Sequence, residues 1–210
     1  MRNYLLACST LLAGTLAQAQ SAPVFRILDI KTQGRACQPN SVAIDIASDQ
    51  QAFTVTFSEF VAELNATTNR REEQQSCRLS FDTEHSLGWE YTIIGVIFRG
   101  AAYLDAGVQG DQQVRFGTRG KDAISRMQLV GPYNDVYQHE SQVNPAGRKW
   151  SGCKGKSSLH RTKDFTIDAN ILLRSRQDNV QGLFTVDSVD GEVSQTYELA
   201  WRPCKDKDKD

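Results

Sequence analysis

Motifs for metal binding and for nucleophilic catalysis are missing from this 210-residue chain. Only three histidines are present, His85, His139 and His160, and none has a metal-ligand spacing such as His-Glu-x-x-His. There is no Gly-x-Ser-x-Gly nucleophile elbow, and no glycine-rich phosphate loop precedes a helix. The sequence therefore indicates no metal ligand, no cofactor and no catalytic residue of a familiar enzyme class.

An excess of basic residues is missing as well. The formal net charge is −1, and removal of Arg2 with the N-terminal segment leaves 23 basic against 25 acidic side chains. Proteins that bind nucleic acids usually carry a basic excess, because their cations must displace the counterions of the phosphates. We therefore expect no nucleic-acid partner.

No apolar run reaches the ~20 residues that a transmembrane helix needs. The longest, Tyr4 to Leu16, follows Arg2 and leads into Ala17-Gln18-Ala19, a small-residue pattern that signal peptidase cleaves. We expect residues 1–19 to be a signal peptide and the mature protein to begin at Gln20, without a membrane segment. The predicted localisation is secreted, or periplasmic in a Gram-negative host.

Two alternatives for the N-terminus are weaker. An uncleaved anchor would have only about thirteen residues to cross the bilayer. A lipid on Cys8, within Leu5-Leu6-Ala7-Cys8, would require a longer charged and apolar region than the seven residues that precede this cysteine.

Four cysteines remain after cleavage, and an oxidising compartment favours two disulfides. Four cysteines permit three pairings. Cys37 and Cys77 each precede an alternating run, whereas Cys153 precedes the late strands and Cys204 closes the last one. These positions favour the pairs Cys37–Cys77 and Cys153–Cys204.

Alternation of apolar and polar residues dominates the chain, and helical spacing is nearly absent. The clearest runs are 42–46, 53–57, 60–64, 79–81 and 165–173. Strands of this kind, without a helix long enough to connect parallel strands, predict an all-β antiparallel β-sandwich stapled by two disulfides. We expect one domain over residues 20–204 and a disordered charged tail over residues 205–210.

Local patterns add four expectations. A phase change near Ser58 and Glu59 predicts a bulge or strand end, and the run from Trp89 to Phe98, apolar on both faces, predicts a central strand. Asp190-Gly191 predicts a hairpin that places Phe184 opposite Tyr197. The polar stretch from Asn65 to Ser76 predicts a mobile loop, in which Asn65 is a glycosylation sequon for a eukaryotic host.

An ordered set of motifs spans most of the chain: Cys37-Gln-Pro-Asn-Ser-Val42, Cys77-Arg-Leu-Ser-Phe81, Gly88-Trp89, Phe98-Arg99-Gly100, Leu104-Asp105-Ala106-Gly107-Val108, Gly131-Pro132, Trp150-Ser151-Gly152-Cys153, Asp187-Ser188-Val189-Asp190 and Trp201-Arg202-Pro203-Cys204. These motifs, in this order, resemble the secreted family called domain of unknown function 4360, known from fungi and bacteria. The resemblance spans about residues 34–204 and implies an exported domain with cysteines, but no activity. Ala36-Cys37-Gln38 and Ser151-Gly152-Cys153 depart from the family's usual Gly-Cys-Pro and Ser-Pro-Cys.

Two function classes follow. The first is a non-enzymatic protein that binds a glycan or a surface protein, with Arg99, Asp105, Trp150 and Asp187 as candidate binding residues. Trp89, Trp150 and Trp201 could stack on sugars, although core positions suit all three better. The second class is a hydrolase with paired carboxylates, whose candidate pairs are Asp187 with Asp190 and Asp164 with Asp168.

Overall fold

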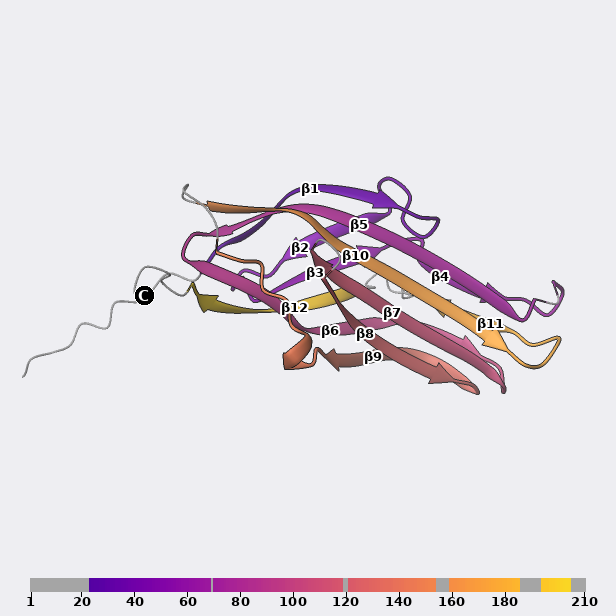
Figure 1. Cartoon of the computed structure of the whole chain (residues 1–210). Helices are drawn as coiled ribbons and strands as arrows, with labels where there is room; N and C mark the ends of the chain where they lie inside the picture. Colours follow the sequence, from indigo (N-terminus) through magenta and orange to yellow (C-terminus); the bar gives the residue numbers. More distant parts are fainter. Residues whose placement is uncertain (1–22, 69, 119–120, 154–158, 186–193, 205–210) are drawn as a thin grey trace, which may run out of the picture.

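The computed structural model describes residues 23–68, 70–118, 121–153, 159–185 and 194–204. They form two antiparallel sheets packed face to face, as the alternation predicts (Figure 1). The five-stranded sheet has the order β1 (Phe25–Gln33), β5 (Glu72–Ser86), β10 (Leu159–Ser175), β7 (Val108–Thr118) and β8 (Lys121–Val130). The seven-stranded sheet has the order β2 (Val42–Ile46), β3 (Ala52–Phe57), β12 (Ser194–Pro203), β6 (Trp89–Leu104), β11 (Gly182–Thr185) and β4 (Val61–Leu64), with β9 (Tyr133–Gln142) on the other side of β6.

Among the described residues, the one helical element is a single 3-10 turn, Pro145–Gly147. None of these residues belongs to a helix that is long and apolar enough to cross a membrane. The predicted signal peptide and the charged tail lie outside the described residues.

Aromatic side chains from both sheets meet in the core. The ring of Phe53 on β3 stacks on Tyr197 at 4.9 Å and meets the edges of Phe81 and Phe165 at 6.4 Å. All four side chains are buried. Full burial of a large apolar side chain stabilises a fold by about 1.5–3 kcal/mol, so this cluster is a main attachment between the sheets.

The phase change near Ser58 is confirmed as a strand end. β3 stops at Phe57 and β4 starts at Val61. β3 pairs with β12 and β4 pairs with β11, so β3 and β4 follow one another on the same side of the seven-stranded sheet. The rings of Phe57 and Phe60 still meet at 5.0 Å, because the intervening turn lets both side chains enter the core.

β6 is the central strand, as predicted, but its apolar pattern has a different cause. β12 and β11 pair with one edge of β6, and β9 pairs with the other. A bulge shifts the register between Ile93 and Gly95, so that Tyr91 and Ile93 face the core before it and Val96 and Phe98 after it. Apolar residues at odd and even positions therefore reflect a change of phase along one strand.

The expected C-terminal hairpin is wrong in its pairing. Phe184 lies opposite Ala102, and Tyr197 lies opposite Val96, so β11 and β12 both run antiparallel to β6 along the same edge. β11 and β12 therefore follow one another along β6 instead of pairing with each other. The 16-residue β6 is long enough to form backbone hydrogen bonds with both strands. The turn at Asp190-Gly191 itself lies outside the described residues.

The polar stretch from Asn65 to Ser76 is only partly a loop. β5 begins at Glu72, and residues 72–76 pair with residues 170–174 of β10. The expectation of a loop as far as Ser76 is thus wrong, because backbone pairing with a neighbouring strand can hold a segment that buries little apolar area.

Both predicted disulfides are present. The Cα atoms of Cys37 and Cys77 lie 5.5 Å apart, and those of Cys153 and Cys204 lie 5.7 Å apart. The first bridge follows from the register, because β1 ends with Gln33 opposite Arg78 and the chain then passes beside Cys77. At Gly34, where φ is +135°, a Cβ would lie 2.3 Å from the Ser76 carbonyl oxygen, so only glycine fits this approach.

Candidate functional site: a polar groove on the five-stranded sheet

A candidate site lies on the outer face of the five-stranded sheet. A groove of about 630 Å³ runs over three adjacent strands, β5, β10 and β7, and over the end of β1. We call it the polar groove. Its lining residues are Gln33, Gly34, Gln74, Ser76, Cys77, Arg78, Asp111, Gln113, Arg115, Asp168, Ala169, Asn170 and Leu172.

The strand register places the polar side chains of the groove in rows. Asp168 on β10 lies between Arg78 on β5 and Arg115 on β7. In the next row along the strands, Asn170 lies between Ser76 and Gln113. Directly opposed residues of an antiparallel pair have Cβ atoms about 4.5–5.5 Å apart, so each row can present several polar groups to one ligand.

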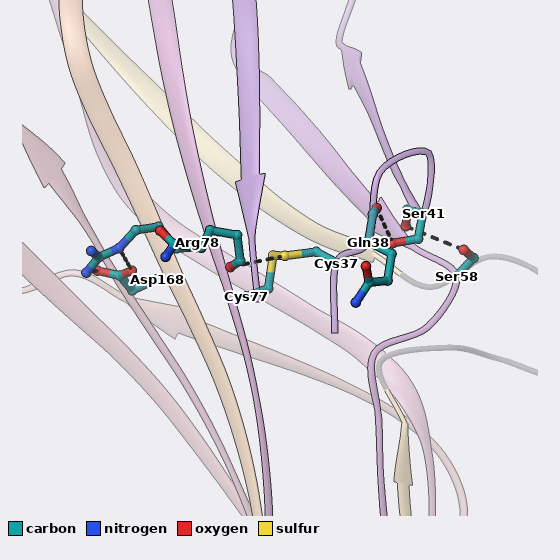
Figure 2. The surroundings of a disulfide bond; sticks show 8 residues. Cys37, Gln38, Ser41, Ser58, Cys77, Arg78 and Asp168 are labelled. Carbon is teal, nitrogen blue, oxygen red and sulfur yellow. Dashed lines mark hydrogen bonds and ion pairs between the residues drawn. A yellow bond between two sulfur atoms is a disulfide. The ribbon is translucent and has the colours of Figure 1, made fainter. Parts of the chain in front are cut away.

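Arg78 and Asp168 form a bidentate ion pair beside the Cys37–Cys77 disulfide (Figure 2). Arg78 Nε donates to Asp168 Oδ1 at 2.5 Å, and Arg78 Nη2 donates to Oδ2 at 3.0 Å. The side chains are 57% and 33% exposed, so solvent screens the pair and its contribution to stability is small. Its main effect is to fix two charged groups at the edge of the groove.

Asp111 is held from three sides at the other end of the groove. It accepts hydrogen bonds from Gln109 Nε2 at 2.8 Å and from Gln128 Nε2 at 2.7 Å, and it pairs with Arg174 Nη2 at 2.9 Å. Both carboxylates of the groove are therefore neutralised by an arginine.

Three amide side chains in the groove have free hydrogen-bonding groups. Gln74, Gln113 and Asn170 make no side-chain hydrogen bond to the part of the chain that the structure describes. Each amide offers two N–H donors and a carbonyl acceptor to a ligand. Because these residues lie on paired strands, the register fixes the point at which each side chain leaves the sheet.

The groove does not offer a carboxylate pair suited to glycoside hydrolysis. Asp168 lies opposite Arg115 and Asp111 lies opposite Leu172, so they are four residues apart along the ladder, about 13 Å at the rise of a β-strand. Glycosidase carboxyls lie roughly 5 to 9.5 Å apart. Asp187 and Asp190 fall outside the described residues, as does the side chain of Asp164. Within the described ranges, no group of three or more His, Cys, Asp or Glu side chains could hold a metal ion.

The candidate residues from the sequence are not brought together. Arg99 is exposed on the outer face of the seven-stranded sheet. Asp105 follows β6, six residues further along an extended chain or about 20 Å away. Its carboxylate accepts a hydrogen bond from the Gln181 backbone N–H at 2.7 Å, which ties the end of β6 to the start of β11. Binding by either residue stays a prediction.

The ring of Trp150 is covered by another side chain of the protein. The Arg202 guanidinium lies 3.8 Å from the centre of its ring, and Arg202 Nε donates to Glu90 Oε1 at 2.6 Å. A cavity of about 20 Å³, room for one water molecule, lies beneath the tryptophan between the sheets. Trp201 packs on the core and donates from Nε1 to the Gln50 carbonyl at 2.9 Å. Asp187, the fourth candidate, lies outside the described residues.

The sequon at Asn65 lies in an exposed turn between β4 and β5. Asn65 Oδ1 accepts hydrogen bonds from the Thr67 backbone N–H at 2.9 Å and from Thr67 Oγ1 at 2.8 Å. The amide nitrogen of Asn65 thus remains open to solvent, and its glycosylation in a eukaryotic host stays a prediction.

Sequence reasoning missed the polar groove. The polar residues at 168 and 170, which alternate with apolar ones, were a usable signal for the outward face of one strand, whereas Gln75 and Gln112 interrupt the alternation on the other two strands. That these faces adjoin depends on the sheet order β5-β10-β7, which local patterns do not contain.

Residues 23–204 match the family described as "Domain of unknown function (DUF4360)". The chain belongs to this family. A fungal protein of Arthroderma benhamiae, named "Uncharacterized secreted protein", is 24% identical over 180 residues, which are 85% of this chain and 71% of the relative. The DUF4360 match covers the whole sandwich from the start of β1 to the second disulfide, so the groove lies within the family domain.

Proposed function

We propose that this DUF4360 protein is exported and binds a carbohydrate in the polar groove without changing it chemically. The N-terminal segment has the pattern of a signal peptide, two disulfides tie the fold, and a relative carries the name of a secreted protein. The observation that carries the binding proposal is the set of free amides on adjacent strands, between the Arg78–Asp168 ion pair and Asp111.

The chemistry of the groove suits a ligand rich in hydroxyl groups. A sugar hydroxyl both donates and accepts, and so does a carboxamide, so Gln74, Gln113 and Asn170 can each serve one or two hydroxyls. A protein partner is favoured less, because the centres of protein interfaces are rich in aromatic side chains and poor in charge. Among the residues that the structure describes, no aromatic side chain lines the groove.

A hydrolase is the second class that the sequence left open, and no arrangement in the groove favours it. Its two carboxylates are far apart along the strands and each is paired with an arginine. A row of exposed aromatic rings outside the groove would have favoured a second site, where sugars stack on the rings. The exposed large apolar side chains among the described residues include one aromatic, Tyr103 on β6, which is 43% exposed.

The proposal predicts loss of glycan binding when the two central amides are truncated. A panel of neutral and acidic oligosaccharides is screened first, and the affinity of each hit is then measured by calorimetry. The Gln113→Ala/Asn170→Ala variant should bind at least about tenfold more weakly, because several hydrogen bonds to the ligand are lost. Circular dichroism checks that the variant keeps the wild-type strand content.

The matched control removes two amides from the opposite side of the sandwich. Asn134 and Gln138 are exposed on β9, which belongs to the seven-stranded sheet. Asn134→Ala/Gln138→Ala should bind like the wild type. Equal loss in both variants, or binding that survives in Gln113→Ala/Asn170→Ala, would refute the groove as the site.

A further inference from the structure

Four arginines close to the polar groove fall into two groups. Arg78 and Arg174 are each paired with a carboxylate, Asp168 and Asp111 respectively. Arg115 and Arg126 are exposed and make no ion pair or hydrogen bond with any described residue through their side chains. Two exposed arginines beside the polar groove, on β7 and β8, are therefore left without an ion pair among the described residues.

The register brings these two arginines close together. Arg115 lies opposite Ile124, and Gln113 lies opposite Arg126, so the arginines are diagonal neighbours on the same face of the β7–β8 pair. Diagonal neighbours in an antiparallel pair have their Cα atoms about 7–8 Å apart, within the joint reach of two long side chains. Two like charges at this distance repel one another, and an anion between or across them relieves that repulsion.

We propose that the ligand of the polar groove is an acidic polysaccharide whose carboxylates bind Arg115 and Arg126, an inference that rests on the carbohydrate-binding function proposed above. A guanidinium binds a carboxylate through two parallel N–H···O hydrogen bonds. Gln113 lies across the strand pair from Arg126 and lines the groove with Arg115 and Asn170. A uronic acid carries its carboxylate and its hydroxyls on the same ring, so it can engage an arginine and a neighbouring amide together.

The surrounding charges favour a sparsely charged polymer over a nucleic acid. The two other arginines near the groove, Arg78 and Arg174, are already paired with carboxylates, and the chain as a whole is slightly acidic. A polymer with a phosphate at every residue would meet Asp111 and Asp168 as well as the two free arginines. A polymer of uronic acids also presents neutral hydroxyl groups, which match the amides of the groove.

The test uses oligogalacturonate of defined length and its fully methyl-esterified form, which differ in charge but not in sugar. Calorimetry on the whole exported protein should show binding of the acid, about tenfold or more weaker binding of the ester, and loss of affinity as salt is raised. Arg115→Gln and Arg126→Gln should each weaken binding of the acid about tenfold and leave the ester unaffected. A sulfated polysaccharide forms a further arm, and preference for it over oligogalacturonate would overturn the carboxylate assignment.

The control is Arg26→Gln, an exposed arginine on β1 that lies opposite Glu84, six residues from the groove residue Arg78 along β5. It should bind the acid like the wild type. If neutral glycans bind and the Gln113→Ala/Asn170→Ala variant loses them while the arginine variants do not differ from wild type, the acidic ligand is refuted and the carbohydrate site stands. If no glycan, acidic or neutral, binds in the groove, the proposed function itself fails.

Discussion

Removal of either disulfide is expected to destabilise the protein by about 4 kcal/mol. The bridges close loops with sequence separations of 40 and 51 residues, and their main effect is to restrict the unfolded chain. The variants Cys37→Ala/Cys77→Ala and Cys153→Ala/Cys204→Ala should therefore have similar losses, apart from a further cavity cost at the buried Cys37 and Cys77.

Urea unfolding of both double variants measures this effect. Removal of both bridges should cost roughly 8 kcal/mol, a large part of the ~5–15 kcal/mol that holds a typical domain together. The reduced protein should then be largely unfolded or close to its midpoint without denaturant. A loss below about 1 kcal/mol in each double variant would show that the bridges do not limit the unfolded chain.

Alkaline pH is expected to unfold the protein steeply above about pH 10, because three tyrosine hydroxyls are held protonated in the core. Burial raises the pKa of Tyr91 to about 12, and its hydrogen bond with Thr83, at 3.2 Å, offsets part of that shift. Burial also raises the pKa of Tyr137 and of Tyr197 above their usual range, and the neighbouring Tyr133 adds to the shift at Tyr137.

The sign follows from proton counting. Above pH 10.0, the usual tyrosine value, the unfolded chain releases these protons while the folded chain keeps them, so deprotonation favours the unfolded state. Each tyrosine contributes a loss of about 1.4 kcal/mol per pH unit, and three contribute about 4 kcal/mol per unit. These groups have no effect on stability well below pH 10, where both states are protonated.

Denaturant unfolding at about pH 9, 10 and 11 checks the slope, and near-ultraviolet absorbance reports tyrosinate formation. Tyr91→Phe should reduce the alkaline slope by about one third, since Phe has no proton to release. A stability that is level through about pH 11 in the wild type would contradict the burial of these hydroxyls.

Alternation predicted much of the fold because inward-facing positions must be apolar on most strands. β2, β3 and β4 follow the runs read from the sequence, and β6 is central as expected. The expected hairpin was wrong, because a strong turn signal at Asp190-Gly191 says nothing about competing partners such as β6. The polar first part of β5 was also missed, since its pairing with β10 leaves no apolar trace.

The candidate site was harder to predict than the fold. Gln74, Gln113 and Asn170 come from strands that are distant in sequence, and none of these residues is unusual by itself. Trp150 drew attention as an aromatic residue, yet its ring is covered by Arg202. The cysteine positions, by contrast, favoured the disulfide pairing that the structure shows, because each bridge joins the flank of one strand to a neighbouring strand or its end.

Nuclear magnetic resonance of the side-chain amide groups tests the location of the ligand most directly. Addition of an oligosaccharide that the screen has identified as a ligand should shift the N–H₂ signals of Gln74, Gln113 and Asn170, which lie in the polar groove. The signals of Asn134 and Gln138 on β9 should stay unchanged. Assignment comes from single Ala variants of these five residues. Shifts confined to Asn134 and Gln138, with the groove amides unperturbed at saturation, would contradict the proposal that the polar groove is the binding site.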